Sequence, residues 1–197
     1  MVVSLLHELH LKITGILDDD ISKFGLNIHD IPVIGNIETL AGDPNAKAII
    51  AIGDNRTRKR IVYRFKRINW MSLIHPCAYV DSSVFIGKGT IIMAGAVIQP
   101  DSMIGNHVII NTGATIDHDC IINDYSHIAP GCHLAGNVTI GEGVLTGIGS
   151  SFIQGINIGK WSVVGAGSVV VKEVDKYCMA KGVPARFDRY LNIQDQE

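Results

Sequence analysis

The chain has 197 residues, which suffice for one long domain or for a small domain joined to a larger one. Its charged fraction is 18% and its net charge is -2, so it lacks the concentrated cationic surface that nucleic-acid binding requires. No apolar stretch reaches the roughly 18 residues that cross a bilayer, and the N-terminus lacks the basic segment of a secretory signal. The four cysteines form no CxxC pair, so we expect a reduced, cytoplasmic protein with no membrane or nucleic-acid partner.

Residues 1–72 predict alternating helices and strands. VVSLLHELH has helical periodicity, TGILDDD and AKAIIAIGDN predict strands, and RTRKRIVYRFKRI predicts a basic helix with its apolar side inward. The alternation indicates a small Rossmann-like α/β domain. The strand and glycine-rich loop that should precede Val2 are missing, so we expect a partial domain. The cationic run on the second helix predicts a solvated face: Arg56, Arg58, Lys59 and Arg60.

Residues 73–197 contain a repeat of six residues. From Ile74 to Val170, 16 of the 17 residues spaced six apart are large and apolar, whereas composition alone gives about eight. A small residue follows most of them four places later, and a glycine often comes directly after. A period of six fits short strands separated by sharp turns, with the apolar residue and the small residue both pointing inward. Cys120 and Cys132 occupy the small inward position and are predicted to lie in the core.

This pattern resembles the hexapeptide-repeat family. The resemblance implies a mainly β fold, a left-handed parallel β-helix with about 18 residues per coil, preceded here by the partial Rossmann-like domain. The C-terminal segment PARFDRYL is expected to form a short helix that covers the last coil.

Three histidines in the repeats are predicted to face outward. His118 and Asp119 lie at turn positions of their hexad, and an imidazole beside a carboxylate has a raised proton affinity and can act as a base. His127 belongs to a column of outward-facing residues, each one coil from the next: Ile91, Ile109, His127, Leu145 and Val163. An exposed apolar column predicts a subunit interface, so we expect a homotrimer with its active site between neighbouring chains. His133 also faces outward and is interpreted as a surface or interface residue.

The segment NTGATIDHDCIINDYSHIAPGCHLAG, at 111–136, resembles bacterial sugar acetyltransferases, which include sialic acid O-acetyltransferases and nucleotide-aminosugar N-acetyltransferases. The resemblance extends from the shortened N-terminal domain to GVPAR near the C-terminus. It implies that His118 is the general base and that Asp119 increases its basicity. It also implies acetyl-CoA contacts at His127, Gly136, Ile148 and Ala166, and nucleotide-sugar contacts at Asp18, Asp19 and Gly53.

We therefore expect an acetyl-CoA-dependent acetyltransferase that acts on the amine of a nucleotide-linked aminosugar, with no metal ion. Acetylation of a sialic acid hydroxyl is the alternative within the class. A metal-dependent carbonic anhydrase is an alternative of another class, because His118, His127 and His133 are numerous enough for a three-histidine site. A non-catalytic binding module is the third, favoured if the shortened N-terminal domain has lost substrate binding.

Overall fold

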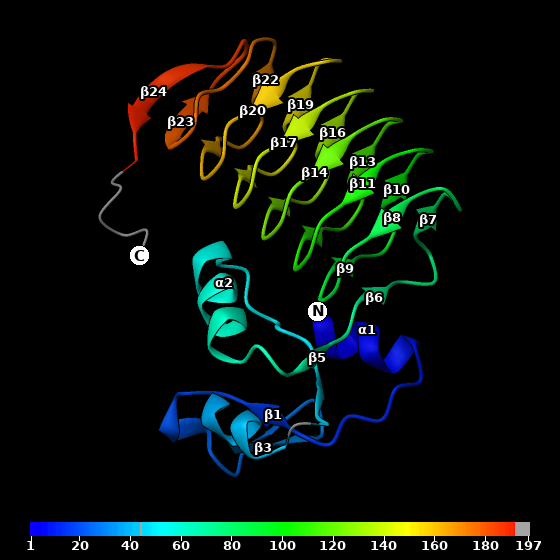
Figure 1. Ribbon diagram of the computed structural model, residues 1–197, viewed down its shortest axis with the longest axis vertical. Helices are drawn as coiled ribbons and strands as arrows, with labels where there is room; N and C mark the ends of the chain where they lie inside the picture. Colours follow the sequence, from blue (N-terminus) through cyan, green and yellow to red (C-terminus); the bar gives the residue numbers. More distant parts are fainter. Residues whose placement is uncertain (44, 192–197) are drawn as a thin grey trace.

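A computed structural model describes residues 1–43 and 45–191. The N-terminal α/β region lies at one end and a stack of β-helical coils continues from it (Figure 1). Strand β5 (Asn69–Trp70) pairs with β4 (Lys47–Ala48) of the N-terminal region, whereas β6 (Leu73–Ile74) pairs with β9 (Ile91–Ile92) in the β-helix. No helix in the described ranges is long and apolar enough to span a membrane.

The N-terminal region contains both predicted helices, α1 (Val2–Glu8) and α2 (Asn55–Arg64). Its predicted strands appear as β1 (Ile16–Leu17) and as β4 (Lys47–Ala48), the latter much shorter than AKAIIAIGDN suggests. Two further strands, β2 (Asn27–Ile28) and β3 (Ile31–Gly35), were not predicted. They form a hairpin and β3 also pairs in parallel with β1, while 3-10 helices occupy Ile21–Lys23 and Ile37–Gly42.

The missed hairpin has a physical explanation in its turn. His29 and Asp30, between β2 and β3, have φ angles of 50° and 64°. A two-residue hairpin turn of this kind needs positive φ at both positions and usually carries Asn-Gly or Asp-Gly. The dipeptide His-Asp gives no such signal, although the buried Ile31 and Val33 alternate with exposed residues as a strand requires.

The β-helix has three faces of two-residue strands, each stacked on the strand 18 residues away. Face 1 consists of β6, β9, β12 (Ile109–Ile110), β15 (His127–Ile128), β18 (Leu145–Thr146) and β21 (Val163–Val164). Face 2 consists of β7 (Tyr79–Val80), β10 (Val97–Ile98), β13 (Thr115–Ile116), β16 (His133–Leu134), β19 (Ser151–Phe152) and β22 (Val169–Val170). Face 3 consists of β8 (Phe85–Ile86), β11 (Met103–Ile104), β14 (Ile121–Ile122), β17 (Thr139–Ile140) and β20 (Asn157–Ile158). Corners 1–2, 2–3 and 3–1 join these faces in chain order.

The second residue of nearly every strand points into the coil and builds the core. Ile98, Ile104, Ile110 and Ile116 are completely buried in consecutive strands. Burial of each such side chain contributes about 1.5–3 kcal/mol, so the column stabilises the fold along its length. Thr146, the one polar residue among the 17 positions of the apolar column, is also buried. Its Oγ1 accepts a hydrogen bond from the backbone N–H of Ala129 at 3.1 Å.

The small inward positions are likewise part of the core. Cys120 and Cys132 are completely buried, which confirms the prediction that they are core residues. Burial raises the pKa of the Cys120 thiol, which disfavours the thiolate.

The prediction of a C-terminal helix in PARFDRYL is wrong. Residues Cys178–Lys181 form β23, which adds to face 1, and Arg186–Tyr190 form β24, which pairs antiparallel with β23. An open sheet edge offers a row of backbone hydrogen bonds that a single helical turn lacks, so the segment extends the sheet. Phe187 and Tyr190 pack against each other on this strand, with ring centroids 4.9 Å apart.

The N-terminal region of the same chain covers the lower part of face 1. Val2 and Leu5 of α1 pack in one cluster with Leu73 and Ile91. Ile91 is 2% exposed and Ile109 5% exposed, so the predicted column on face 1 is not a continuous exposed surface. The prediction of a subunit interface along this column is wrong at both residues, because the outward direction of a repeat position does not show what packs against it.

Candidate active site

His118 and Asp119 form an exposed pair at corner 2–3, between β13 and β14. Asp119 has a φ of 58°, a left-handed conformation that Asp and Asn adopt more readily than most residues. This turn brings its carboxylate back onto the neighbouring imidazole, and His118 Nδ1 and Asp119 Oδ2 lie 2.7 Å apart. The backbone N–H of His118 donates to Asp117 Oδ1 at 2.8 Å, which fixes the turn.

The electrostatics of the pair raise the proton affinity of the His118 ring. The pKa of His118 is raised, chiefly because Asp119 accepts its hydrogen bond, and further because of the charge of Asp117. Partial desolvation acts in the opposite direction. With Nδ1 bonded to the carboxylate, Nε2 is the nitrogen left to accept a proton from a substrate. About 59% of the His118 side chain is exposed, so a substrate can reach it.

Gly136 lies directly beneath the His118 ring, one coil further along the same corner. A Cβ built on Gly136 would lie 2.7 Å from both Cε1 and Nε2 of His118. The backbone N–H of Asn137 also donates to the His118 carbonyl at 2.9 Å. The imidazole of His118 can therefore pack against the next coil only because Gly136 has no side chain.

His127 lies on face 1, away from His118, and its surroundings favour a neutral imidazole with the proton on one ring nitrogen. Asn111 Oδ1 accepts from the backbone N–H of Thr112 at 2.8 Å, which orients the amide so that its Nδ2 faces His127 Nε2 at 3.1 Å. An amide nitrogen only donates, so Nε2 carries the lone pair and the ring proton is on Nδ1. Burial and, after it, the charge of Arg58 lower the pKa of His127 to about 4, against a raising contribution from the Gly53 backbone.

Ile148 and Ala166 lie at corner 1–2, one coil apart. The backbone N–H of Gly167 donates to the Ile148 carbonyl at 2.8 Å, so the two turns are stacked directly. Ile148 is 62% exposed and Ala166 is exposed as well, so both side chains are accessible at this corner.

Asp18 and Asp19 lie in the N-terminal region, directly after β1. Asp18 Oδ2 pairs with Lys23 Nζ at 2.8 Å, and this hydrogen bond is the main reason that its pKa is lowered. Asp19 Oδ1 accepts from the backbone N–H of Ile37 at 3.1 Å. Both carboxylates therefore stabilise local turns.

Gly53 borders a groove of about 320 Å³ between the start of α2 and the β-helix. The groove combines charged and apolar walls, and its lining residues are Gly53, Asp54, Asn55, Arg56, Gly143, Leu145, Trp161, Val163 and Leu191. Asn55 is 7% exposed, and its Nδ2 donates to the carbonyls of Gly143 and Val144 at 3.1 and 3.2 Å. Asn55 thereby fixes the position of the groove's wall.

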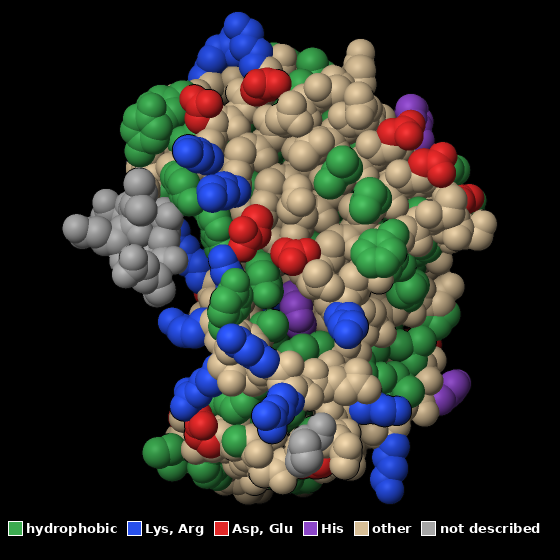
Figure 2. Space-filling model, in the orientation of Figure 1, with side chains coloured by type: hydrophobic (Ala, Val, Ile, Leu, Met, Phe, Trp, Pro, Cys, Tyr) green, Lys and Arg blue, Asp and Glu red, His purple; other side chains and the backbone are tan. Residues whose placement is uncertain are grey.

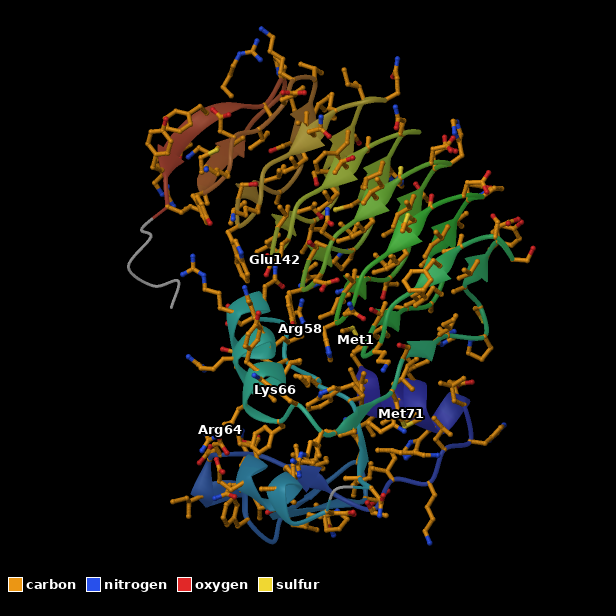
Figure 3. All side chains as sticks on the ribbon, in the orientation of Figure 1. Met1, Arg58, Arg64, Lys66, Met71 and Glu142 are labelled. Carbon is orange, nitrogen blue, oxygen red and sulfur yellow. The ribbon has the colours of Figure 1, made fainter. Side chains whose placement is uncertain are left out.

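Arg58 is the residue that sequence reasoning missed most clearly. It is 1% exposed, so the prediction that the whole cationic run is a solvated face is wrong at this position. Figure 3 shows it on the side of α2 that faces the coils, where its guanidinium donates to the carbonyls of His107 and Tyr125. Its position on the inner side of α2, one turn after the N-cap Asp54, was the available signal.

One chain therefore brings the predicted site residues together only in part. His118, Asp119 and Gly136 lie together at corner 2–3, and Ile148 lies with Ala166 at corner 1–2. His127 lies beside Gly53 on face 1.

A continuous exposed apolar surface occurs on face 3. Phe85, Met103 and Ile121 stack in register and are 59%, 53% and 41% exposed. Figure 2 shows apolar side chains gathered over β8, β11 and β14. This surface is bordered by the corner that carries His118, so a partner that covers it also approaches the base.

The three histidines considered for a metal site are on different parts of the coil. His118 is at corner 2–3, His127 on face 1 and His133 on face 2, where its Nδ1 lies 2.9 Å from Thr115 Oγ1. Within residues 1–43 and 45–191 of one chain, no group of three His, Cys, Asp or Glu side chains is arranged to hold a metal ion.

The fold and the exposed histidine–carboxylate pair define a hexapeptide-repeat transferase. Residues 83–118 and 101–136 match the model of the bacterial transferase hexapeptide (six repeats), and residues 1–65 match the PglD N-terminal domain. The chain belongs to the PglD-type family of hexapeptide-repeat sugar N-acetyltransferases.

Two solved structures show the relationship over nearly the whole chain. A histidine-to-asparagine variant of perosamine N-acetyltransferase from Caulobacter crescentus, in complex with CoA and GDP-perosamine, is 35% identical. The alignment covers 95% of this chain and 90% of that one, with a TM-score of 0.89. The acetyltransferase domain of PglB from Neisseria gonorrhoeae FA1090, in complex with acetyl coenzyme A, is also 35% identical, with coverages of 95% and 92% and a TM-score of 0.90.

A curated relative matches a shorter segment. UDP-N-acetylbacillosamine N-acetyltransferase of Bacillus subtilis strain 168 is 42% identical over 87 residues, which are 42% of this chain and 40% of the relative. The chain spans less than half the length of the curated relatives that it matches.

Proposed function

We propose that the protein transfers the acetyl group of acetyl-CoA to the amine of a nucleotide-linked aminosugar. The observation that carries the proposal is the exposed His118–Asp119 pair, held at 2.7 Å on a turn of the β-helix. The relatives support the substrates, because their names describe sugar N-acetyltransferases and their complexes hold CoA, acetyl coenzyme A or GDP-perosamine.

In the proposed reaction the sugar amine attacks the thioester carbonyl directly. Nε2 of His118 accepts the proton of the amine as the N–C bond forms, and Asp119 stabilises the resulting imidazolium through Nδ1. When the C–S bond breaks, the thiolate of CoA takes this proton and leaves as the thiol. The thioester oxygen gains negative charge and needs a hydrogen-bond donor, for which His127 or a backbone N–H is the proposed group.

The proposed active enzyme is a homotrimer in which face 3 is buried between copies. The exposed column of Phe85, Met103 and Ile121 supports this surface in place of the one on face 1. Contact through face 3 brings the His118 corner of one copy close to its neighbour. Gly136 and His118 of one chain would then line the acetyl-CoA groove with Ile148 and Ala166 of the next.

The nucleotide sugar is proposed to bind at Gly53, with Asp18 and Asp19 as further contacts. The groove beside Gly53 supports this assignment for Gly53. The two aspartates would need to exchange their bonds to Lys23 and Ile37 for bonds to the ligand.

Thiol release from acetyl-CoA tests the function against a panel of nucleotide-linked aminosugars and free sialic acid. Turnover with an amine-bearing nucleotide sugar is expected, and His118→Ala should lower kcat by about 10²–10⁴-fold, the usual contribution of general-base catalysis. His133→Ala is the matched control, since His133 is also an exposed β-helix histidine. Turnover with sialic acid alone would show that the enzyme is an O-acetyltransferase. Full activity of His118→Ala would contradict the role of His118 as the general base.

Molecular mass in solution tests the trimer separately. The wild-type chain should have three times the monomer mass of 21.3 kDa, and Met103→Glu should reduce that mass because it buries a carboxylate in an apolar interface. A monomeric wild-type chain with full activity would contradict the proposed assembly.

A further inference from the structure

Arg58 is a buried cation whose hydrogen bonds, within the described residues, all end on backbone carbonyl groups. Its Nε donates to the carbonyl of His107 at 3.2 Å. Its Nη1 donates to the carbonyls of Ile52 at 3.2 Å and Gly53 at 2.9 Å. Its Nη2 donates to the carbonyls of Tyr125 at 2.7 Å and Ser126 at 3.4 Å. A guanidinium offers five N–H groups in a fixed plane, so one side chain can satisfy several carbonyls at once.

These carbonyls come from two parts of the molecule that the proposed reaction must hold together. Ile52 and Gly53 form the loop before α2, where the nucleotide sugar is proposed to bind. Tyr125 and Ser126 directly precede His127, which is proposed to face the thioester. Arg58 thus joins the acceptor side of the site to the acyl side.

A purely structural account leaves the charge of Arg58 unexplained. Burial penalises the cation and lowers the pKa of Arg58 to about 10, an effect that the charge of Asp54 opposes. Apolar contacts already hold the N-terminal region against the β-helix elsewhere, where Val2 and Leu5 pack with Ile91. A buried charge that costs stability is better explained by what it does to its surroundings.

The surroundings include two imidazoles. The charge of Arg58 acts on both His107 and His127, and burial together with this charge lowers the pKa of each to about 4. His107 also faces Asp124 and stacks on Tyr125, with ring centroids 5.6 Å apart. For His127, the strand neighbours Ile109 and Leu145 are uncharged, and Arg58 is the one charged side chain of the described ranges that acts on the ring.

We propose that Arg58 is a positioning residue for acetyl transfer. Its guanidinium holds the Gly53 loop against the strand that carries His127, and its charge keeps that imidazole neutral. A neutral ring accepts from Asn111 at Nε2 and has one N–H, whose partner is the backbone of Gly53, so the ring itself joins its strand to the Gly53 loop. The inference rests on the proposed function, because it assigns Arg58 to the geometry of that reaction.

The test combines histidine titration by NMR with steady-state kinetics. The variants are Arg58→Met, which removes the charge and the bonds, and Arg58→Lys, which keeps the charge but loses the planar set of donors. Arg60→Met is the matched control, because Arg60 is an exposed arginine of the same helix. The titration of His127 is followed in the free protein, so it does not depend on any acetyltransferase activity.

The wild-type ring should stay neutral with its proton on Nδ1 well below pH 6, whereas Arg58→Met should shift its titration toward the ordinary value of about 6.5. Arg58→Lys should keep the low titration but raise the KM for the acceptor sugar about tenfold or more, with a smaller change in kcat. Arg60→Met should change neither quantity.

Two results would overturn the inference. One is a titration of His127 near pH 6.5 in the wild-type protein. This measurement needs no variant, so it can be made even if Arg58→Met fails to fold. The other is a folded Arg58→Met or Arg58→Lys protein with unchanged titration and unchanged kinetics. Loss of the proposed function looks different, since the titrations would follow the expected pattern while no acceptor in the panel turned over.

Discussion

Substitution of Gly136 by alanine probes the geometry of the proposed base without touching its chemistry. The added Cβ would lie 2.7 Å from Cε1 and Nε2 of His118, whereas ordinary carbon contacts are about 3.5–4.0 Å. The ring must therefore move by roughly 1 Å, and a misplacement of this size can lower a rate about 10²-fold. Since His118 is 59% exposed, the ring can swing toward solvent, and the stability should change by no more than about 0.5 kcal/mol.

The assay compares kcat and the melting temperature of Gly136→Ala with those of wild type. Gly42→Ala is the matched control, because a Cβ at Gly42 meets nothing within 4 Å. We expect a 10- to 100-fold lower kcat for Gly136→Ala at nearly unchanged melting temperature, and wild-type values for Gly42→Ala. Wild-type kcat in a folded Gly136→Ala protein would refute the placement of the base over this glycine.

Three further predictions concern charge and hydrogen bonding. Asp119→Asn removes the main cause of the raised His118 pKa, so the acid limb of the kcat/KM profile should shift to lower pH while the plateau rate falls; an unshifted limb would contradict the pairing. Asn55→Ala removes the side-chain donor of the Gly143 carbonyl, whereas the Val144 carbonyl still accepts from the backbone N–H of His127, and the free energy of unfolding should fall by about 1–3 kcal/mol in denaturant titration; an unchanged value would show that water replaces the amide. His107 and His127 have folded pKa values of about 4, below the unfolded value of about 6.5, so the unfolded state binds more protons between these pH values. Stability should therefore be fully present above pH 6.5 and fall as the pH is lowered toward 4, and His107→Phe should flatten this dependence.

The repeat made the β-helix predictable because each strand obeys the same rule. Ile98 pairs with Ile116 and Val97 with Thr115, so a spacing of 18 residues recurs from coil to coil. Once the hexad is read, the burial of a residue follows from its position, as it does for Cys120. The C-terminal segment lies beyond the repeat, and there local helical periodicity competed with an open sheet edge, which a sequence pattern does not display.

The N-terminal contribution to the site could not be predicted from periodicity in the same way. Arg58 and Arg60 belong to one cationic run, yet the first is 1% exposed and the second is exposed. Their exposures differ because one side of α2 contacts backbone carbonyls at a corner of the β-helix. Every residue has a backbone carbonyl, so the sequence does not indicate where such a contact forms. The same limit applies to Asn55, whose side-chain amide donates to two carbonyls of one turn more than 80 residues away.

The base itself depends on two departures from a uniform scaffold. At corner 2–3 the residues Asp101, Asp119 and Asn137 have φ angles of 59°, 58° and 59°, so consecutive coils offer the same backbone to a side chain. What differs is the preceding residue, which is proline before Asp101, histidine before Asp119 and glycine before Asn137. An imidazole placed above a glycine has room for its ring and a carboxylate beside it, and neither neighbouring coil offers that combination. The conformation of the turn is thus common to these coils. The proposed reactivity depends on the imidazole of His118 in one coil and on the missing side chain at Gly136 in the next.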